Sequence, residues 1–286
     1  MTMRILTLFV RHGSAKYPQA LDELRDFQRR RLPGVTHELL VIDNGPGEPS
    51  PVPGAEVIRG SNRFWEFSAW DDALASVGAR IRDHDLVHLA TSAYGTLYTR
   101  YIDRIDQGVL EEIAGRGAAL GHIDYYNEPV ELLGYAGQAW LRSSFVFLPP
   151  AELATLGSLV GCTEVERIFS PDPSSPFRPD APVSPNYRRY VYDWLTGEGT
   201  GQGVTWHSRF VLDRESFPFF QAKAMAIFNE QMLAIRLRLQ GCSMVDATWL
   251  ATELGARPSG RGRMPFPHWR VQLSRRDTDA VPLPPT

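Results

Sequence analysis

The stretch HELLVIDNGPG, residues 37–47, joins a strand-like run to a polar ending and a tight turn. Its centre is continuously apolar, which is typical of a strand buried on both faces of a sheet. Asp43 and Asn44 close the run, and the Gly/Pro sequence after them indicates a turn. An earlier run of the same kind, RILTLFV at residues 4–10, predicts another buried strand. These two segments favour an α/β fold.

Helical and strand-like segments alternate over residues 4–160. In residues 63–81, for example, apolar side chains recur at spacings of three and four, which predicts an amphipathic helix. This alternation predicts a mixed α/β sheet with helices on both faces. Further strands are predicted at 56–62, 84–95, 118–126 and 139–150, and helices at 17–32, 63–81, 108–117 and 150–160.

The C-terminal part has a different pattern. Residues 170–186 are rich in Pro, Ser and Asp, which predicts a surface crossing. Residues 216–241 predict a long helix with Gly241 just past its end. The tail from Arg257 is rich in Arg and Pro, and we expect it to be irregular. The C-terminal part is therefore predicted to be mostly helical.

The composition excludes several classes of protein. The 286 residues are 43% hydrophobic and 22% charged, as in an ordinary folded chain. A net charge of −3 argues against a general nucleic-acid-binding protein, which normally carries a basic face. No apolar run reaches the roughly 20 residues that span a bilayer, and the start lacks the pattern of a signal peptide. Cys162 and Cys242 form no metal-ligand cluster, so we expect two buried thiols in a cytoplasmic protein.

Arg11, His12 and Gly13 end the first predicted strand, and they resemble the Arg-His-Gly motif of histidine phosphatases. Such an enzyme needs a second Arg and a second His to match the charge of the transferred phosphoryl group. No candidate for the second His is followed by the Gly that usually accompanies it in that family. The candidates are His88, His122 and His207. A loop at the ligand-binding edge of a sheet explains the same three residues without phosphatase chemistry. A phosphohydrolase is kept as an alternative.

The segment LLVIDNGPG resembles the VVDNGS strand of glycosyltransferases with the GT-A fold. The segments GSNRFWEFSAWDDAL (60–74) and DLVHLATSA (85–93) then follow in that family's order. Together with WLRSSFVFLPPAELATL (140–156) and FQAKAMAIFNEQMLAIRLRLQG (220–241), they look like bacterial glycosyltransferases of polysaccharide and lipopolysaccharide biosynthesis. The resemblance covers most of residues 4–241.

This resemblance implies a single GT-A-like (Rossmann-like) domain over residues 1–286. Residues 1–160 would form the nucleotide-sugar-binding core, and residues 161–286 an acceptor-side, mostly helical extension. In that family the acidic residue that closes the second strand accepts hydrogen bonds from the base or ribose of the donor. Asp43 would take this role here, although a turn carboxylate explains it as well. The residues implied in nucleotide-sugar binding are Arg11, Asp43, Asn44, Asn62, Arg63, Glu66, Asp71, Thr91 and Ser92.

The chain departs from the family at its metal motif. Thr91-Ser92-Ala93 stands where the family has Asp-x-Asp, whose carboxylates hold a divalent cation against the diphosphate. The segment Asp83-His84-Asp85 begins its strand, at the wrong end of the sheet. We therefore predict no metal ligand, and a use of Mn²⁺ or Mg²⁺ stays open. Arg11, Arg63 or Lys16 would then neutralise the diphosphate.

The catalytic base has three candidates, of which at most one acts. Asp124 and Glu128 follow a predicted strand at its carboxyl end, and Glu230 lies in an apolar part of the long helix. A carboxylate in the position of Glu230 is either paired, with Lys223 as the nearest candidate, or has a raised pKa. His207 ranks after these three, and Ser143 and Ser144 are strand hydroxyls without an assigned role.

The sequence thus predicts a glycosyltransferase that moves a sugar from a nucleoside-diphosphate sugar to a saccharide or lipid-linked glycan, and metal independence of this reaction stays open. Two alternatives remain: the phosphohydrolase with Arg11-His12-Gly13, and a catalytically silent nucleotide-sugar-binding protein. The expected partners are the donor and a glycan or glycolipid acceptor. No nucleic acid or transmembrane segment is expected, and peripheral membrane contact stays open.

Overall fold

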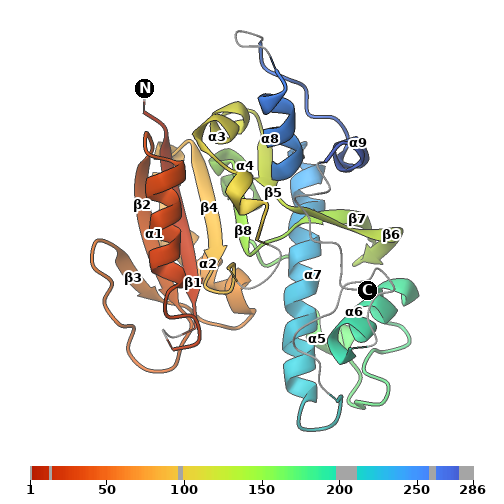
Figure 1. The fold of residues 1–286 in the computed structure, drawn as a ribbon. Coiled ribbons are helices and arrows are strands. Elements are labelled where there is room, and N and C mark those ends of the chain that lie inside the picture. Colours follow the sequence, from red (N-terminus) through yellow and green to blue (C-terminus); the bar gives the residue numbers. More distant parts are fainter. Residues whose placement is uncertain (1, 13–14, 96–98, 198–210, 258–261, 277–286) are drawn as a thin grey trace.

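The computed structural model describes residues 2–12, 15–95, 99–197, 211–257 and 262–276. A sheet of seven strands, in the order β3-β2-β1-β4-β8-β5-β9, runs through the molecule (Figure 1). All of its pairings are parallel except those of β8, which is antiparallel to both β4 and β5. Its strands are β1 (Arg4–Arg11), β2 (Thr36–Asp43), β3 (Glu56–Arg59), β4 (Leu86–Thr91), β5 (Ala118–Gly121), β8 (Phe145–Leu148) and β9 (Ser243–Asp246).

Helices cover both faces of this sheet, because its strands are apolar on both sides. Alternate strand residues, such as Ile5 and Leu6, pack into two different buried clusters. One cluster joins the sheet to α1 (Ala20–Arg31), α3 (Gln107–Ile113) and α8 (Ala247–Gly255). The other joins it to α2 (Trp65–Val77), α4 (Pro150–Leu156) and the second half of α7 (Phe217–Leu239). Short 3₁₀ turns are η1 (Gly78–Asp83) and η2 (Ile102–Arg104).

A smaller unit lies against the first half of α7. It contains the antiparallel hairpin of β6 (Ile123–Leu132) and β7 (Tyr135–Leu141), together with α5 (Val165–Ile168) and α6 (Pro185–Thr196). Aromatic side chains fill this third cluster, with Tyr187, Phe220 and Phe228 fully buried. Figure 1 shows α7 as the long helix that passes from this unit to the main sheet.

The predicted fold class is confirmed: a mixed α/β sheet with helices on both faces and a mostly helical C-terminal part. Two predicted strands were wrong in one respect. The runs 118–126 and 139–150 each divide between the main sheet and the hairpin, at His122 and at Arg142–Ser144. Polar residues interrupt both runs at these points, and their groups hydrogen-bond one another where the chain leaves the sheet; Arg142 N–H, for example, donates to the carbonyl of His122.

The expectation of an irregular tail was also wrong in part. Residues 161–286 supply the edge strand β9 as well as helices, and α9 (Trp269–Ser274) forms within the Arg/Pro-rich tail. The reason is a buried amide: Gln272 is fully buried, its Oε1 accepts from Asp246 N at 2.8 Å, and its Nε2 donates to Met244 O at 2.9 Å. These bonds fix α9 against β9.

Candidate functional site

The site lies at the carboxyl edge of the sheet, where the parallel strands β1, β2, β4 and β5 all end. Ligands of open α/β sheets bind at this edge because the loops that follow the strands meet there. The antiparallel strand β8 begins at the same edge, so Ser143 and Ser144 join it from the opposite chain direction. Thr91 N–H donates to Ser144 O at 3.1 Å, which ties the end of β4 to this turn.

Arg11 and Asp43, which end neighbouring strands, form a buried ion pair. Arg11 Nε lies 2.8 Å from Asp43 Oδ2, and both residues are less than 10% exposed. Arg11 Nη2 also donates to Ser50 O at 2.7 Å, and Gly45 N–H donates to Asp43 Oδ1 at 2.8 Å. Asp43 therefore closes a turn, and it also matches the charge of Arg11. The roles predicted for them toward a donor stay predictions.

Asn44 places a buried acceptor beside this pair. Its Nδ2 donates to Trp65 O at 3.1 Å, while its Oδ1 has no hydrogen-bond partner among the described residues. Gly60 lies so close that a Cβ there would come within 1.9 Å of this oxygen. The position after β3 thus requires glycine for a close approach.

The segment between β3 and α2 is held in an unusual backbone conformation. Asn62 and Trp65 both have φ of 52°, a left-handed region that costs non-glycine residues of order 1–3 kcal/mol. Asn62 and Arg63 are exposed at this edge. Asn62 does not cap the next helix, because α2 begins at Trp65 with Phe64 as its N-cap residue.

Asp71 holds the loop after α4 in place by hydrogen bonds. Its carboxylate accepts hydrogen bonds from Leu159 N–H and Ser158 Oγ, and from Val160 N–H at 3.3 Å. These three bonds account for its place on α2 without a ligand, and its predicted nucleotide role stays a prediction.

Thr91 ends β4 and Ser92 follows it, and both are partly exposed. Ser92 N–H donates to Val10 O at 2.8 Å, which holds it next to the end of β1. Ser92 and Arg11 line a small pocket of about 170 Å³ below α1, with Tyr17, Leu21 and Pro51 on its other sides. Hence this edge contains a cavity as well as polar groups.

A second ion pair occupies the point where β5 passes into β6. Arg142 donates to Asp124 Oδ2 from Nε at 3.0 Å and from Nη2 at 2.8 Å. His122 Nε2 lies 3.4 Å from Asp124 Oδ1. Burial acts to raise the pKa of Asp124, but the charge of Arg142 and the hydrogen bond from His122 outweigh it and hold that pKa well below its usual range. Asp124 is therefore ionised near neutral pH and is a poor proton acceptor.

Glu230 lies beside this pair on the inner face of α7. Ser143 donates to Glu230 Oε1 from its backbone N–H and from its hydroxyl, each at 2.7 Å. Burial raises the pKa of Glu230 to about 7, against the two hydrogen bonds from Ser143 and with a smaller contribution from the charge of Asp124. A carboxyl group with a pKa near 7 is well matched to proton transfer at neutral pH. Of the two alternatives for Glu230, the raised pKa describes it, and its role as the base stays a prediction.

Three buried tyrosines interact electrostatically with Glu230. Burial is the main cause of the raised pKa of Tyr101, Tyr126 and Tyr187, and the charge of Glu230 adds to it in each case. Tyr126 also stacks on Tyr190 with ring centroids 5.0 Å apart. The charge of Glu230 therefore acts on all three phenols, and burial is the cause of its own raised pKa.

Glu66 and Lys223 continue the charged groups along α2 and α7. Burial raises the pKa of Glu66, and the charge of Lys223 opposes this rise. Lys223 Nζ lies 4.8 Å from the ring centroid of Trp65. The charge of Glu230 makes a smaller contribution, which raises the pKa of Lys223.

The remaining candidates lie elsewhere. Glu128 is exposed in β6, at an irregularity of the hairpin register. His207 and Gly13 lie outside the described residues. His12 is exposed, whereas His88 is 1% exposed in the middle of β4, where it stacks on Phe147 with centroids 4.2 Å apart. Burial lowers the pKa of His88 to about 3, so it is a neutral core residue.

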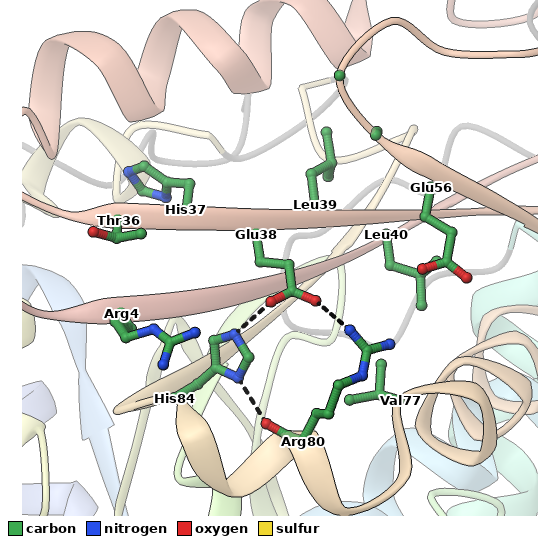
Figure 2. A pocket seen from close by; sticks show the side chains of 12 residues that line it. Arg4, Thr36, His37, Glu38, Leu39, Leu40, Glu56, Val77, Arg80 and His84 are labelled. Carbon is green, nitrogen blue, oxygen red and sulfur yellow. Dashed lines mark hydrogen bonds and ion pairs between the residues drawn. The ribbon is translucent and has the colours of Figure 1, made fainter.

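A larger pocket, of about 450 Å³, lies at the opposite, amino edge of the sheet (Figure 2). There Glu38 accepts from His84 Nε2 and from Arg80 Nη1, each at 3.1 Å. The Asp83-His84-Asp85 segment lies at this amino edge, as predicted, and Asp85 accepts from Arg4 N–H at 2.8 Å. We place the candidate site at the carboxyl edge, because ligands of open α/β sheets bind outside the carboxyl ends of the strands.

The residues at the carboxyl edge do not fit a divalent cation of the usual kind. Its main carboxylates, Asp43 and Asp124, are each paired with an arginine, and β4 ends in Thr91-Ser92-Ala93. Within the described ranges, no group of three or more His, Cys, Asp and Glu side chains is placed to hold a metal ion. Among the described helices, none is both long and apolar enough to cross a membrane.

No protein-family model matches this chain, and no curated protein matches it. Among solved structures it is similar to the mannosyltransferase PcManGT from Pyrobaculum calidifontis in complex with GDP-Man and Mn²⁺, at 10% identity and a TM-score of 0.36, over 87% of this chain and 78% of that one. It is also similar to a 2-C-methyl-D-erythritol 4-phosphate cytidylyltransferase from Thermus thermophilus, at 13% identity and a TM-score of 0.32, over 78% and 99% of the two chains. A third similar structure is a CMP:2-keto-3-deoxy-manno-octonic acid synthetase complexed with CTP, at 10% identity and a TM-score of 0.33, over 57% and 80%. These distant likenesses concern the α/β fold and carry no argument about activity.

Sequence reasoning missed the partners of the two central carboxylates. It gave Ser143 no role, did not consider Arg142, and treated His122 only as a possible phosphatase residue. The signal was present, since each of these polar residues interrupts a strand-like apolar run. Such an interruption indicates where a chain leaves its sheet. Residues that leave the sheet at its carboxyl edge are candidates for a ligand-binding site.

Proposed function

We propose that the chain is a glycosyltransferase that moves a sugar from a nucleoside-diphosphate sugar to a hydroxyl of a saccharide or lipid-linked glycan. The observation that carries this proposal is Glu230, a carboxylate with a pKa near 7 that Ser143 holds at the carboxyl edge of the sheet. A general base of this pKa suits the deprotonation of an acceptor hydroxyl at neutral pH.

In the proposed reaction, the acceptor oxygen attacks the anomeric carbon of the donor while Glu230 takes the proton of the hydroxyl. The bond between the anomeric carbon and the diphosphate oxygen breaks, and the nucleoside diphosphate leaves with the electron pair. Asp124 stays ionised, and it remains paired with Arg142 beside Glu230. No step passes through a metal ion, because the residues at this edge do not fit one.

The phosphohydrolase alternative has less support. Arg11 is engaged with Asp43 and Ser50, and His88 belongs to the core. His122 follows β5, which β4 and β8 separate from β1. Neither His88 nor His122 therefore gives His12 the partner that a phosphohistidine mechanism needs.

The proposal is tested in two steps on the full chain. First, thermal unfolding is followed with UDP-, GDP-, CMP- and dTDP-linked sugars, with EDTA and with Mn²⁺. One donor class should raise the midpoint by mass action. Second, transfer to glycan acceptors and slow hydrolysis of that donor are measured. If no nucleotide sugar binds, the proposal is wrong.

The Glu230→Gln variant should bind the donor as the parent does and lose activity by about 10²- to 10⁴-fold, the usual contribution of a general base. Glu131→Gln is the matched control, because Glu131 is exposed on β6. Full activity of Glu230→Gln, or loss of activity in Glu128→Gln instead, would refute the assignment of the base. Binding without turnover in the parent chain would favour the silent binding protein.

A further inference from the structure

The outer edge of β2 is covered over only half of its length. β2 pairs with β1 along all 8 of its residues, but its ladder with β3 begins at Leu40, which lies opposite Glu56. Among the described residues, no strand therefore occupies the positions opposite residues 36–39. In Figure 1 this half of β2 forms the outer border of the sheet. A stretch of four strand residues is about 13 Å long.

The main-chain groups of His37 and Leu39 point out of this uncovered edge. Thr36 N–H donates to Met3 O at 2.8 Å, so the main chain of Thr36 faces β1. Successive strand residues direct their main-chain groups to opposite sides, so those of His37 and Leu39 face away from β1. Because the ladder with β3 begins only at Leu40, His37 has no partner strand on that side in the part of the chain that the structure describes. Unpaired main-chain groups on a sheet edge are a template for another strand.

The pocket of about 450 Å³ at the amino edge adjoins the same half of β2 (Figure 2). Residues 36–40 of β2 form one wall of it, residues 54–56 form another, and Val77 and Arg80 line it from α2 and η1. Volumes of roughly 300–1,000 Å³ are typical of ligand-binding pockets. An added strand would therefore find open space for the side chains that it directs to this face of the sheet.

The charges that line this pocket are matched at its centre and unmatched at its two ends. At the centre, Glu38 accepts from Arg80 Nη1 and from His84 Nε2, each at 3.1 Å, so both of its carboxylate oxygens are engaged. Arg4 and Glu56 are exposed, and neither side chain forms a hydrogen bond or an ion pair with a described residue. Figure 2 shows them on opposite sides of Glu38. A complementary ligand carries an anionic group at one end and a cationic group at the other.

We infer that the uncovered edge of β2 binds an extended segment of a partner protein by strand addition, with an acidic side chain toward Arg4 and a basic side chain toward Glu56. The main-chain groups of His37 and Leu39 supply the hydrogen bonds of the added strand, and the two charged ends of the pocket select its side chains. This surface lies at the amino edge of the sheet, so the inference does not depend on the proposed function.

The geometry of a strand fixes the sequence pattern of the partner. Alternate side chains of the added segment face the pocket, so its basic and acidic residues lie two positions apart. Antiparallel pairing is slightly more stable than parallel pairing. In an antiparallel segment the basic residue comes first and lies opposite Glu38, within reach of Glu56, and the acidic residue lies opposite Thr36. The residue between them pairs with His37.

The first test uses the synthetic peptide acetyl-VKVEV-amide and the full chain, and it needs no variant of the protein. Calorimetric titration should give a dissociation constant of about 1 mM or lower. The bound peptide should protect the amides of His37 and Leu39 from hydrogen exchange. Methylation of the central valine nitrogen of the peptide removes the hydrogen bond to the His37 carbonyl and should weaken binding about tenfold. Methylation of the glutamate nitrogen, which points away from β2, is the matched control and should have little effect.

The second test removes the charges at the two ends of the pocket. Arg4→Gln and Glu56→Gln should each weaken binding of acetyl-VKVEV-amide by about twofold to fivefold, as expected for the loss of an exposed ion pair. Both side chains are exposed, so we expect the variants to unfold at the same temperature as the parent. The matched controls are Arg214→Gln, in the turn before α7, and Glu131→Gln, on β6, because both residues are exposed on other elements.

Four results would overturn the inference. The first is that neither acetyl-VKVEV-amide nor its exchanged form, acetyl-VEVKV-amide, binds at millimolar concentration. The second is that the two methylated peptides bind equally well, because no strand is then added. The third is that Arg4→Gln and Glu56→Gln both bind the peptide as the parent does. The fourth is protection of the His37 amide that rises with protein concentration in the absence of peptide, which would place a second copy of the chain at this edge.

Discussion

Ser143 donates both its backbone N–H and its hydroxyl to one oxygen, Oε1 of Glu230, at 2.7 Å each. Both donors come from the turn between β7 and β8, so the carboxylate of α7 is positioned by the residues at which the chain re-enters the main sheet. Two hydrogen bonds to the ionised form would normally lower a carboxyl pKa. Here burial outweighs them, and the pKa of Glu230 is raised to about 7.

The raised pKa of Glu230 predicts a pH-dependent stability. In the unfolded chain this group loses its proton near its ordinary pKa, but in the folded protein only near pH 7. The folded state therefore binds more protons between these values, and the free energy of unfolding falls as the pH rises from about 4.5 to 7. Glu230→Gln removes this fall in the free energy of unfolding, which amounts to up to about 3 kcal/mol. The thermal midpoint of the variant minus that of the parent should be larger at pH 8 than at pH 5. An equal difference at both pH values would contradict a raised pKa of Glu230.

The pair of Asp124 and Arg142 predicts the opposite dependence. Asp124→Asn leaves Arg142 partly buried without its counter-charge, and should cost about 2 kcal/mol of unfolding free energy at pH 7. Because the folded-state pKa of Asp124 is depressed, its contribution is present above the unfolded pKa and is lost as the pH falls through the folded pKa. Urea titrations should thus show a deficit that is constant above about pH 4 and shrinks below it. Asp180→Asn, which removes an exposed pair with Arg178, should leave the urea midpoint nearly unchanged.

A substitution of Asp71 separates its structural role in the fold from the predicted role in binding the donor. Asp71→Asn weakens the hydrogen bonds that hold residues 158–160, and should lower the free energy of unfolding by about 2 kcal/mol. The midpoint shift that a bound nucleotide sugar causes should be unchanged in this variant. If instead the shift is lost while stability is retained, Asp71 contacts the donor as the sequence predicted.

Gln231 is a weak point in the buried packing of α7. The residue is 1% exposed, and neither of its side-chain polar atoms has a hydrogen-bond partner among the described residues. Gln231→Met keeps the length of the side chain and removes the unpaired amide, so it should raise the free energy of unfolding by about 1 kcal/mol. The matched change Gln138→Met should lower it, because Gln138 Nε2 donates to Tyr126 O at 2.9 Å. Urea unfolding of both variants would decide, and a loss of stability in Gln231→Met would contradict this reading.

The sequence predicted the strands that are buried on both faces, because residues 4–10 and the centre of residues 37–43 form apolar runs. The same rule failed at His122 and Ser143, where one apolar run serves two sheets. Nothing local distinguishes these cases, since the division depends on hydrogen bonds to partners such as Asp246, whose Oδ2 accepts from Ile123 N–H at 3.1 Å.

The residues of the candidate site, too, could be predicted from the sequence only in part. Asp43 and Thr91 were named as candidates from the resemblance to glycosyltransferases, and Glu230 because it interrupts an apolar helix face. Their partners were not found, because a pair such as Arg11 with Asp43 is set by the register of neighbouring strands. Sequence spacing alone does not give that register.

The last strand of the sheet also bears on how the protein is made. β5 is complete at Gly121, but the strand that covers its outer edge, β9, ends only at Asp246. At 5–20 residues per second, translation takes on the order of 10 s to cover that interval. For that time the nascent sheet carries an uncovered edge, which is able to pair with a neighbouring chain on the same polysome. The yield of correctly folded protein should therefore depend on the speed of translation between these two strands.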